Sequence, residues 1–213
     1  MQSTCKRLSD SSSCSVAAFR ERPSILVIKI TLSSARPRLL QLLKLPSYQK
    51  RRVILASGKE SDFFIDCKQT VLTAEGHALA GEVLYEALFP LEHCAAVAGV
   101  ELGGCPLARA VAMMSFLRGS PIDAVYVRKE AKDHGSQRLL EGTSRLKPGA
   151  HVAIVEDVVT TGGSTLKAAE KITAAGYTVS AVIALVDRLE GGGEAIEAAG
   201  FAFTCIYTRD DFV

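Results

Sequence analysis

From position 94 onward, short apolar runs alternate with helix-like segments along the chain. The apolar runs read CAAVAGV, DAVYV, HVAIVEDVV, TVSAVIALVD and FAFTCIYT. Their length and their content of valine, alanine and isoleucine are typical of strands buried on both faces of a sheet. Strands that alternate with helices connect through right-handed crossovers, which place the helices over the two faces. We therefore expect an α/β fold with a central, mainly parallel sheet flanked by helices.

The first part of the chain predicts a small appendage to this sheet. Residues 1–34 are rich in serine and carry few acids, so we expect an N-terminal extension, either a disordered tail or the product of a start site placed too far upstream. An organelle transit peptide is the alternative, whereas the apolar core of a secretory signal is missing. The folded domain is expected over residues 35–213. It begins with a helix over Ala35–Leu45 that ends at Pro46, and two short strands follow around a Ser57–Gly58 turn.

Helix boundaries follow from capping residues and from the spacing of leucines. One helix is expected to start after Thr73, whose hydroxyl suits an N-cap. Its apolar stripe comprises Leu79, Val83, Leu84 and Leu88. Further helices are expected from Pro106 to Leu117, across STLKAAEKITAAG with Gly176 as its cap, and across GGEAIEAAG.

Composition excludes several classes of function. The net charge of +2 is too small to indicate nucleic-acid binding, and no apolar run is long enough to span a bilayer. The six cysteines are scattered, without a CxxC pair or a histidine at metal-ligand spacing. We therefore expect reduced thiols in a cytoplasmic protein, with no zinc site, no disulfide framework, and no nucleic-acid or membrane partner.

The segment TTGGST, Thr160–Thr165, has the composition of a phosphate-binding loop. Its two glycines allow a sharp turn and the close approach of a ligand, and its four hydroxyls can donate to phosphate oxygens. The helix that follows adds unpaired N–H groups and the positive end of its dipole. The loop lacks the GK[ST] ending of a triphosphate-binding P-loop and is not GxGxxG, so a monophosphate is the expected ligand.

Two acids, Glu156 and Asp157, precede this loop at the end of an apolar run. Carboxylates would repel a phosphate, but they accept hydrogen bonds from sugar hydroxyls and can orient water around Mg²⁺. A phosphate on the loop and a ribose on the acids make one ligand, a ribose 5-phosphate. The alternative, that the acids only cap the next loop, suits a lone acid better than this pair.

A long charged segment, Arg128–Pro148, follows the DAVYV run. Its cations include Arg128, Lys129, Lys132, His134 and Arg138. Little apolar content argues against packing in a core, and long charged loops beside ligand sites are often lids. Such a lid would stabilise the charge that grows on a pyrophosphate leaving group. A solvated surface loop is the alternative that composition alone favours.

Four motifs in order resemble a known family. The apolar run with its two acids and TTGGST is similar to the phosphoribosyl pyrophosphate (PRPP) motif of type I phosphoribosyltransferases. RKEAKDHG resembles the catalytic loop of orotate phosphoribosyltransferases, LASGKESDFFID (Leu55–Asp66) their N-terminal motif, and LVDRLEGG (Leu185–Gly192) their D-R-x-E-x-G segment. The resemblance runs from about Ala35 to the C-terminus. It implies the type I phosphoribosyltransferase fold, with a small N-terminal hood.

The resemblance also implies an activity and a set of site residues. The activity is transfer of the phosphoribosyl group from PRPP to orotate, giving orotidine 5′-monophosphate and pyrophosphate in pyrimidine (UMP) biosynthesis. Mg²⁺ is implied as cofactor, held mainly by the substrate, as is a homodimer whose lid loop is shared across subunits. Orotate would meet Phe64, Thr160 and Arg188, and Arg188 suits a planar carboxylate. The PRPP-binding residues implied are Arg128, Lys129, Lys132, His134, Glu156, Asp157, Val158, Val159, Thr160, Thr161, Gly162, Gly163 and Ser164, with Lys132, His134 and Asp157 as the catalytic candidates.

The chain departs from the family pattern at three positions. Glu156 stands where many members have aspartate, and Ala56 and Gly103 occupy positions of two family lysines. Backbone N–H groups of Gly103 and Gly104 could bind pyrophosphate instead. Whether Lys59 or Lys68 compensates stays open.

Other interpretations stay open as well. Phe64 could be a core aromatic, and Arg188 could form a surface ion pair with Glu190. A purine or uracil phosphoribosyltransferase would share the PRPP motif but not RKEAKDHG. A PRPP-binding transcriptional regulator would add a DNA-binding domain, for which the N-terminal extension is too short. A fusion with orotidine monophosphate decarboxylase would need a second barrel domain, and the chain ends at Val213.

Overall fold

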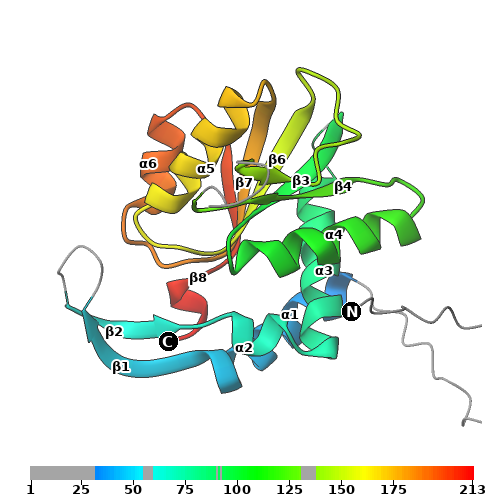
Figure 1. The fold of residues 1–213 in the computed structure, drawn as a ribbon. Coiled ribbons are helices and arrows are strands. Elements are labelled where there is room, and N and C mark those ends of the chain that lie inside the picture. The colour runs from blue at the N-terminus through cyan, green and yellow to red at the C-terminus, as the bar shows by residue number, and fades with distance from the viewer. Residues whose placement is uncertain (1–31, 55–59, 90, 92, 131–137) are drawn as a thin grey trace, which may run out of the picture.

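The structure, a computed structural model, describes residues 32–54, 60–89, 91, 93–130 and 138–213. A six-stranded sheet lies between helices on its two faces, and a separate two-stranded hairpin lies below it (Figure 1). The predicted α/β fold with a mainly parallel sheet is confirmed. Within the described ranges, no helix is both long enough and apolar enough to cross a membrane.

The strands of the sheet are arranged in the order β5-β4-β3-β6-β7-β8. They are β3 (Cys94–Val100), β4 (Asp123–Val127), β5 (Leu140–Glu141), β6 (His151–Val159), β7 (Thr178–Asp187) and β8 (Phe203–Thr208). Neighbouring strands are parallel except β4 and β5. The chain changes direction across the sheet between β3 and β6, and α/β proteins bind ligands beyond the carboxyl ends of strands at such a point.

Helices pack on both faces of the sheet (Figure 1). One face carries α1 (Leu32–Leu42), α3 (Ala74–Leu88) and α4 (Gly104–Leu117), and the other carries α5 (Gly163–Ala174) and α6 (Gly192–Ala198). Short turns of helix complete the chain: a π-helical turn (Leu43–Ser47), α2 (Lys68–Val71) and a 3₁₀ turn (Arg209–Asp211).

The helix boundaries agree with the sequence in part. Thr73 caps α3 as predicted, because its Oγ1 accepts a hydrogen bond from the Gly76 N–H at 3.1 Å. The predicted stripe of α3 is buried. The first helix begins three residues earlier than predicted, at Leu32, inside the segment expected to be an extension. Two serines there add no apolar position, so leucine spacing could not reveal that turn. Residues 1–31 lie outside the described residues.

Two further helix boundaries and one strand also differ from the prediction. The first helix ends at Leu42, before a wider turn that contains Pro46, since Pro46 has no N–H to donate to the Leu42 carbonyl oxygen four residues earlier. α4 starts two residues early, at Gly104. The strand β5 was not predicted, because two residues are too few to show periodicity.

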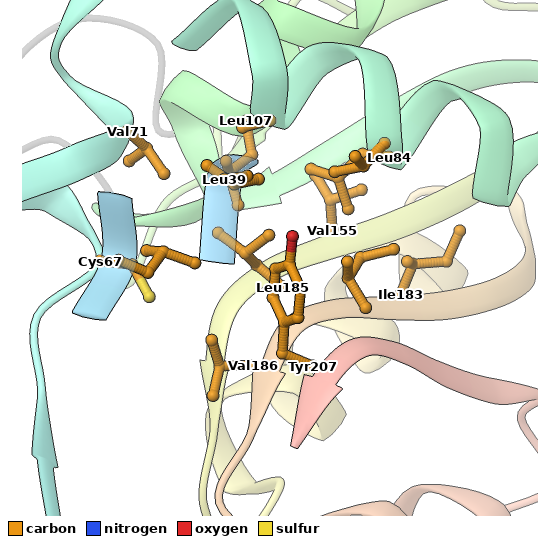
Figure 2. Close-up of a cluster of buried hydrophobic side chains, with 14 of the residues drawn as sticks. Leu39, Cys67, Val71, Leu84, Leu107, Val155, Ile183, Leu185, Val186 and Tyr207 are labelled. Atoms are coloured by element: carbon orange, nitrogen blue, oxygen red, sulfur yellow. The ribbon is translucent and has the colours of Figure 1, made fainter. Parts of the chain in front are cut away.

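One apolar core lies between the sheet and the helices α1, α3 and α4. Val155 of β6 and Ile183 and Leu185 of β7 meet Leu84 of α3 and Leu107 of α4 there (Figure 2). A second core on the opposite face joins the alternate residues of the same strands to α5 and α6. Because successive side chains of a strand point to opposite faces, the parity of a residue in β6 decides which core it faces.

The hairpin of β1 (Tyr48–Ile54) and β2 (Glu60–Ile65) is antiparallel, as predicted. The expected Ser57–Gly58 turn lies outside the described residues. Phe63 is buried at 1% exposure, with its ring 5.1 Å from that of Tyr48 and 5.7 Å from that of Phe212. The C-terminal segment therefore holds this hood against the domain.

Candidate active site

The predicted phosphate loop joins β6 to the N-terminus of α5. Gly162 has φ 77°, in the left-handed region that favours glycine, and a Cβ added there would lie 3.0 Å from the Gly192 carbonyl oxygen. The helix starts at Gly163, so the N–H groups of its first turn open toward the loop. Thr165 is buried, and its hydroxyl has no hydrogen-bond partner among the described residues. This local geometry is that of an anion-binding loop.

Glu156 lies within β6 and faces α5. Its Oε1 accepts a hydrogen bond from the Ser164 hydroxyl at 3.4 Å. Its Oε2 is buried without a partner in the described part of the chain, and the residue is only 7% exposed. Burial, and then the charge of Asp157, raise the pKa of this carboxyl well above its usual range. A ligand hydroxyl that donates to Oε2 would relieve this desolvation.

Asp157 points to the opposite face of β6, toward α2 and the start of α4. Its Oδ1 accepts a hydrogen bond from the Val158 N–H at 3.0 Å, and its carbonyl oxygen accepts a weak one from the Cys67 thiol at 3.7 Å. Burial raises the pKa of the Asp157 carboxyl, while the positive charge of Lys68 opposes that rise. The two acids therefore lie near the carboxyl end of β6 on opposite faces of the sheet, and their side chains have different neighbours.

Among the described residues, Lys68 is a cation that the fold places near Asp157. It lies in α2 and forms an ion pair with Asp66 at 2.5 Å. The hydrogen bond that Lys68 donates to the Asp66 carboxylate is the main cause that raises the pKa of Lys68, and the Asp157 charge adds to it. Lys59, the other lysine considered in place of the missing family lysines, lies outside the described residues, as does Ala56.

Gly103 packs directly against the Asp157 carboxylate. A Cβ added at Gly103 would lie 2.0 Å from Asp157 Oδ2, far inside van der Waals contact. A Cβ at Gly104 would lie 2.6 Å from the Val155 carbonyl oxygen. The glycine at position 103 therefore has a structural reason in this chain, because any side chain there would displace the acid.

Hydrogen bonds fix the backbone of Arg128 and Lys129, the first two residues of the charged segment. Lys129 donates its N–H to Glu101 Oε2 at 2.9 Å, and the Arg128 N–H donates to the Leu139 carbonyl oxygen at 2.9 Å. Lys171 Nζ donates to the carbonyl oxygens of Arg128 and Lys129, at 2.8 Å each. The catalytic candidates Lys132 and His134 lie outside the described residues. Of the cations expected to bind pyrophosphate, the structure thus describes Arg128 and Lys129.

The two candidates for orotate contact come from the hairpin and from the end of β7. Arg188 is 7% exposed; its Nη2 donates to the Phe63 carbonyl oxygen and lies 2.8 Å from Glu190 Oε1. The ion pair considered as an alternative is present, but it is buried. Phe64 is half-buried, and the core aromatic of β2 is its neighbour Phe63. The Arg188–Phe63 hydrogen bond brings the two elements side by side.

A hollow of about 340 Å³ lies between the base of the charged segment and α5. Ser164 of the phosphate loop lines it, together with four cations: Arg128, Lys129, Lys167 and Lys171. Sequence reasoning missed both lysines of α5. The available signal was their spacing, since Ser164, Lys167 and Lys171 recur at helical intervals and share one face.

The described residues hold no group of three or more His, Cys, Asp or Glu side chains placed to bind a metal ion. The buried, unpartnered Glu156 Oε2 suits a sugar hydroxyl or a metal-bound water better than a direct metal bond. The donor set therefore fits a Mg²⁺ ion that is held mainly by oxygens of the substrate.

Comparison with known proteins first defines the class. The family described as phosphoribosyl transferase domain matches residues 78–213, which include the acids, the phosphate loop and the charged segment. The chain is thus a phosphoribosyltransferase by domain.

Its relatives then define the family. The chain is 66% identical over 181 residues to an orotate phosphoribosyltransferase of Sorangium cellulosum, which covers 85% of this chain and 94% of the relative. It is 42% identical to one of a Bradyrhizobium species, over 85% of this chain and 98% of the relative. The chain belongs to the orotate phosphoribosyltransferase family.

Solved structures agree with this assignment. The Mycobacterium tuberculosis orotate phosphoribosyltransferase, solved in complex with Fe(III) dicitrate, is similar with a TM-score of 0.72 and 38% identity. The same enzyme in complex with PRPP is similar with a TM-score of 0.69 and 33% identity. Each comparison covers 84% of this chain and 98% of the solved one.

Proposed function

We propose that this protein transfers the phosphoribosyl group of PRPP to orotate, giving orotidine 5′-monophosphate and pyrophosphate in pyrimidine biosynthesis. The observation that carries the proposal is the continuous strand–acids–loop–helix unit of β6 and α5 at the switch point of the sheet. The relatives that share the family are named for this activity.

The reaction is a displacement at the anomeric carbon of the ribose. The bond from that carbon to the pyrophosphate oxygen breaks, and its electron pair leaves on pyrophosphate. A ring nitrogen of orotate forms the new bond with its lone pair and loses its proton to solvent. Because the protein forms no covalent bond, its contribution is positioning and the stabilisation of charge.

Each end of PRPP has its own residues in this proposal. The 5′-phosphate binds the loop formed by Thr160, Thr161, Gly162, Gly163 and Ser164, against the N-terminus of α5. The ribose hydroxyls donate to Glu156 and Asp157, with Val158 and Val159 as the backbone between the acids and the loop. Arg128 and Lys129, with Lys132 and His134 further along the segment, stabilise the charge on the leaving pyrophosphate.

Orotate lies between the hairpin and the end of β7. Phe64 packs on its ring, Thr160 borders it, and Arg188 faces its carboxylate. Glu156 and Asp157 would hold a Mg²⁺ ion indirectly, through ribose oxygens or water, and the ion would supply partial neutralisation of the pyrophosphate charge. We also propose a cytoplasmic location, in keeping with the scattered cysteines, of which the four described are free.

The first test is orotate consumption, followed by ultraviolet absorbance with PRPP and Mg²⁺, against adenine, hypoxanthine and uracil. We expect turnover of orotate alone. Turnover of another base would preserve PRPP binding but refute the orotate pocket. Binding of PRPP without turnover of any base would indicate a regulator or a degenerate enzyme.

We further propose a homodimer in which the lid of one subunit reaches the site of the other. Inactive Lys132→Ala and inactive Asp157→Asn, when mixed, should then regain about a quarter of wild-type activity, because random exchange makes half the molecules mixed dimers with one intact site each. Subunit exchange is checked with differently tagged copies. Absence of recovery in a sample with proven exchange would contradict the shared lid.

A further inference from the structure

Lys171 makes an unusual pair of contacts for a lysine on the outer part of a helix. It lies two turns beyond Ser164 on α5, and it is half-buried. Its ammonium group donates to two successive backbone carbonyl oxygens, those of Arg128 and Lys129, at 2.8 Å each. Both acceptors belong to Arg128 and Lys129, the two described cations that are expected to bind pyrophosphate.

Glu101 holds the same backbone from the other side. It lies in the loop after β3, and its carboxylate accepts the Lys129 N–H at 2.9 Å. The backbone of Glu101 is itself fixed, because its N–H donates to the Val127 carbonyl oxygen at 3.0 Å. The N–H and the carbonyl of Lys129 are thus each bound to a charged side chain, from two different elements. That arrangement leaves the backbone of Lys129 little freedom to rotate.

We infer that Lys171 and Glu101 are positioning residues, which hold the backbone of Arg128 and Lys129 so that both side chains meet the pyrophosphate of PRPP. The inference deepens the proposed function and rests on it. α5 then serves both ends of the substrate. Its first turn binds the 5′-phosphate. Lys171, about 10 Å further along the same rigid helix, binds the backbone at the start of the pyrophosphate-binding segment.

The chemistry of lysine suits this role. An ammonium group has three donors and no acceptor, so two carbonyl oxygens can share it. The carbonyls it binds belong to residues whose own side chains are cations, and the bonds therefore order the backbone without neutralising those cations. Lys167, one turn earlier, lines the same hollow but makes no hydrogen bond to this backbone within the described residues. It is therefore a matched control for charge.

The experiment compares Lys171→Met, Lys171→Arg and Lys167→Met for steady-state kinetics, PRPP binding by calorimetry, and thermal stability. For Lys171→Met we expect kcat/KM for PRPP to fall about tenfold, with the KM for orotate changed by less than about twofold. Lys171→Arg should recover most of the loss, because arginine also donates to two carbonyls. Lys167→Met removes a charge from the same hollow but no hydrogen bond to this backbone, so its loss should not exceed about threefold.

Repeating Lys171→Met in an enzyme that already lacks the positioned cations distinguishes a positioning role from a general loss of stability. If Lys171 acts through Arg128 and Lys129, then Lys171→Met should cost less than about threefold in an enzyme that already carries both Arg128→Ala and Lys129→Ala. Equal losses for the Lys171 and Lys167 variants would overturn the inference, since they would indicate charge alone. So would a full loss that persists in the enzyme lacking both cations.

Orotate turnover by the wild type tests the proposed function, and PRPP affinity of the variants tests the positioning role. If the wild type turned over no orotate, that function would fail, while PRPP affinity would still test the inference. Weaker PRPP binding by Lys171→Met than by Lys167→Met would support the positioning role, and equal binding would refute it.

Discussion

The two regions proposed to bind PRPP are built in different ways. The ribose 5-phosphate region comes from one unbroken stretch, Glu156 to Ser164, in which strand, loop and helix follow each other. The pyrophosphate region depends on Arg128 and Lys129, whose backbone is held by residues 28 positions before and 42 positions after Lys129. A short-range region can be recognised as a motif, whereas a long-range region exists only in the folded chain.

The difference has a physical cause. A glycine at a left-handed position and a helix N-terminus create a phosphate site from local backbone geometry alone. Orienting a charged segment needs partners that do not belong to it. The contrast is not complete, because Gly103, the residue before α4, packs against Asp157 of the ribose 5-phosphate region.

The largest effect is expected within the contiguous region. Asp157→Asn should lower kcat/KM for PRPP about a hundredfold, because hydrogen bonds from ribose hydroxyls to a charged acceptor are worth about 1.5–3 kcal/mol. Steady-state kinetics measure the loss. Asp210→Asn, an exposed acid near the C-terminus, should change nothing. A loss below about threefold for Asp157→Asn would remove the acid from the ribose site.

The next effect tests whether the contiguous region is really self-contained. Gly103→Ala should lower kcat/KM for PRPP about tenfold, since the new methyl group must displace the Asp157 carboxylate. In an Asp157→Ala background, the same change should have little further effect, because the collision is gone. Additive losses in the two backgrounds would show that position 103 acts independently of the acid.

The smallest effect concerns stability and its dependence on pH. Burial raises the pKa of Glu156, so the folded state favours the protonated carboxyl. Stability is therefore lost as the pH rises from the ordinary pKa of glutamate, 4.5, toward the raised value in the fold. Glu156→Gln, which has no charge to bury, should unfold a few degrees higher than the wild type at pH 7.5.

That gain should shrink as the pH falls toward 5, which thermal melts at several pH values will show. If the rise in unfolding temperature of Glu156→Gln did not depend on pH, its cause would be packing and not the burial of a charge. PRPP should narrow the difference at pH 7.5, because the ribose hydroxyls stabilise the ionised carboxylate.

Much of the fold could be predicted because its signals are local. The apolar runs identified the five parallel strands, and Thr73 identified the start of α3. β5 escaped prediction, since its two residues pair with β4 only because the chain returns there. The turn of α1 before Ala35 also escaped, since serines carry no periodic signal.

The candidate site divides in the same way. Glu156, Asp157 and the phosphate loop were identifiable from composition and order, and their local geometry agrees with an anion-binding loop. Their roles toward PRPP, like those of Phe64 and Arg188 toward orotate, stay predictions. Lys171 and Glu101 could not be found as a pair, since nothing in either segment indicates the other.

The sequence by itself determined the alternation of strands and helices, the acids before a glycine loop, and the family to which the chain belongs. These properties depend on neighbours in the chain, whose backbone preferences are set within a few residues. Only the tertiary structure decided that Asp157 fills the space beside Gly103, and that Lys171 and Glu101 hold the Lys129 backbone from two sides. Those contacts join elements that meet only when the sheet and helices pack, because hydrogen bonds and steric exclusion depend on distance in space and not on position in the chain.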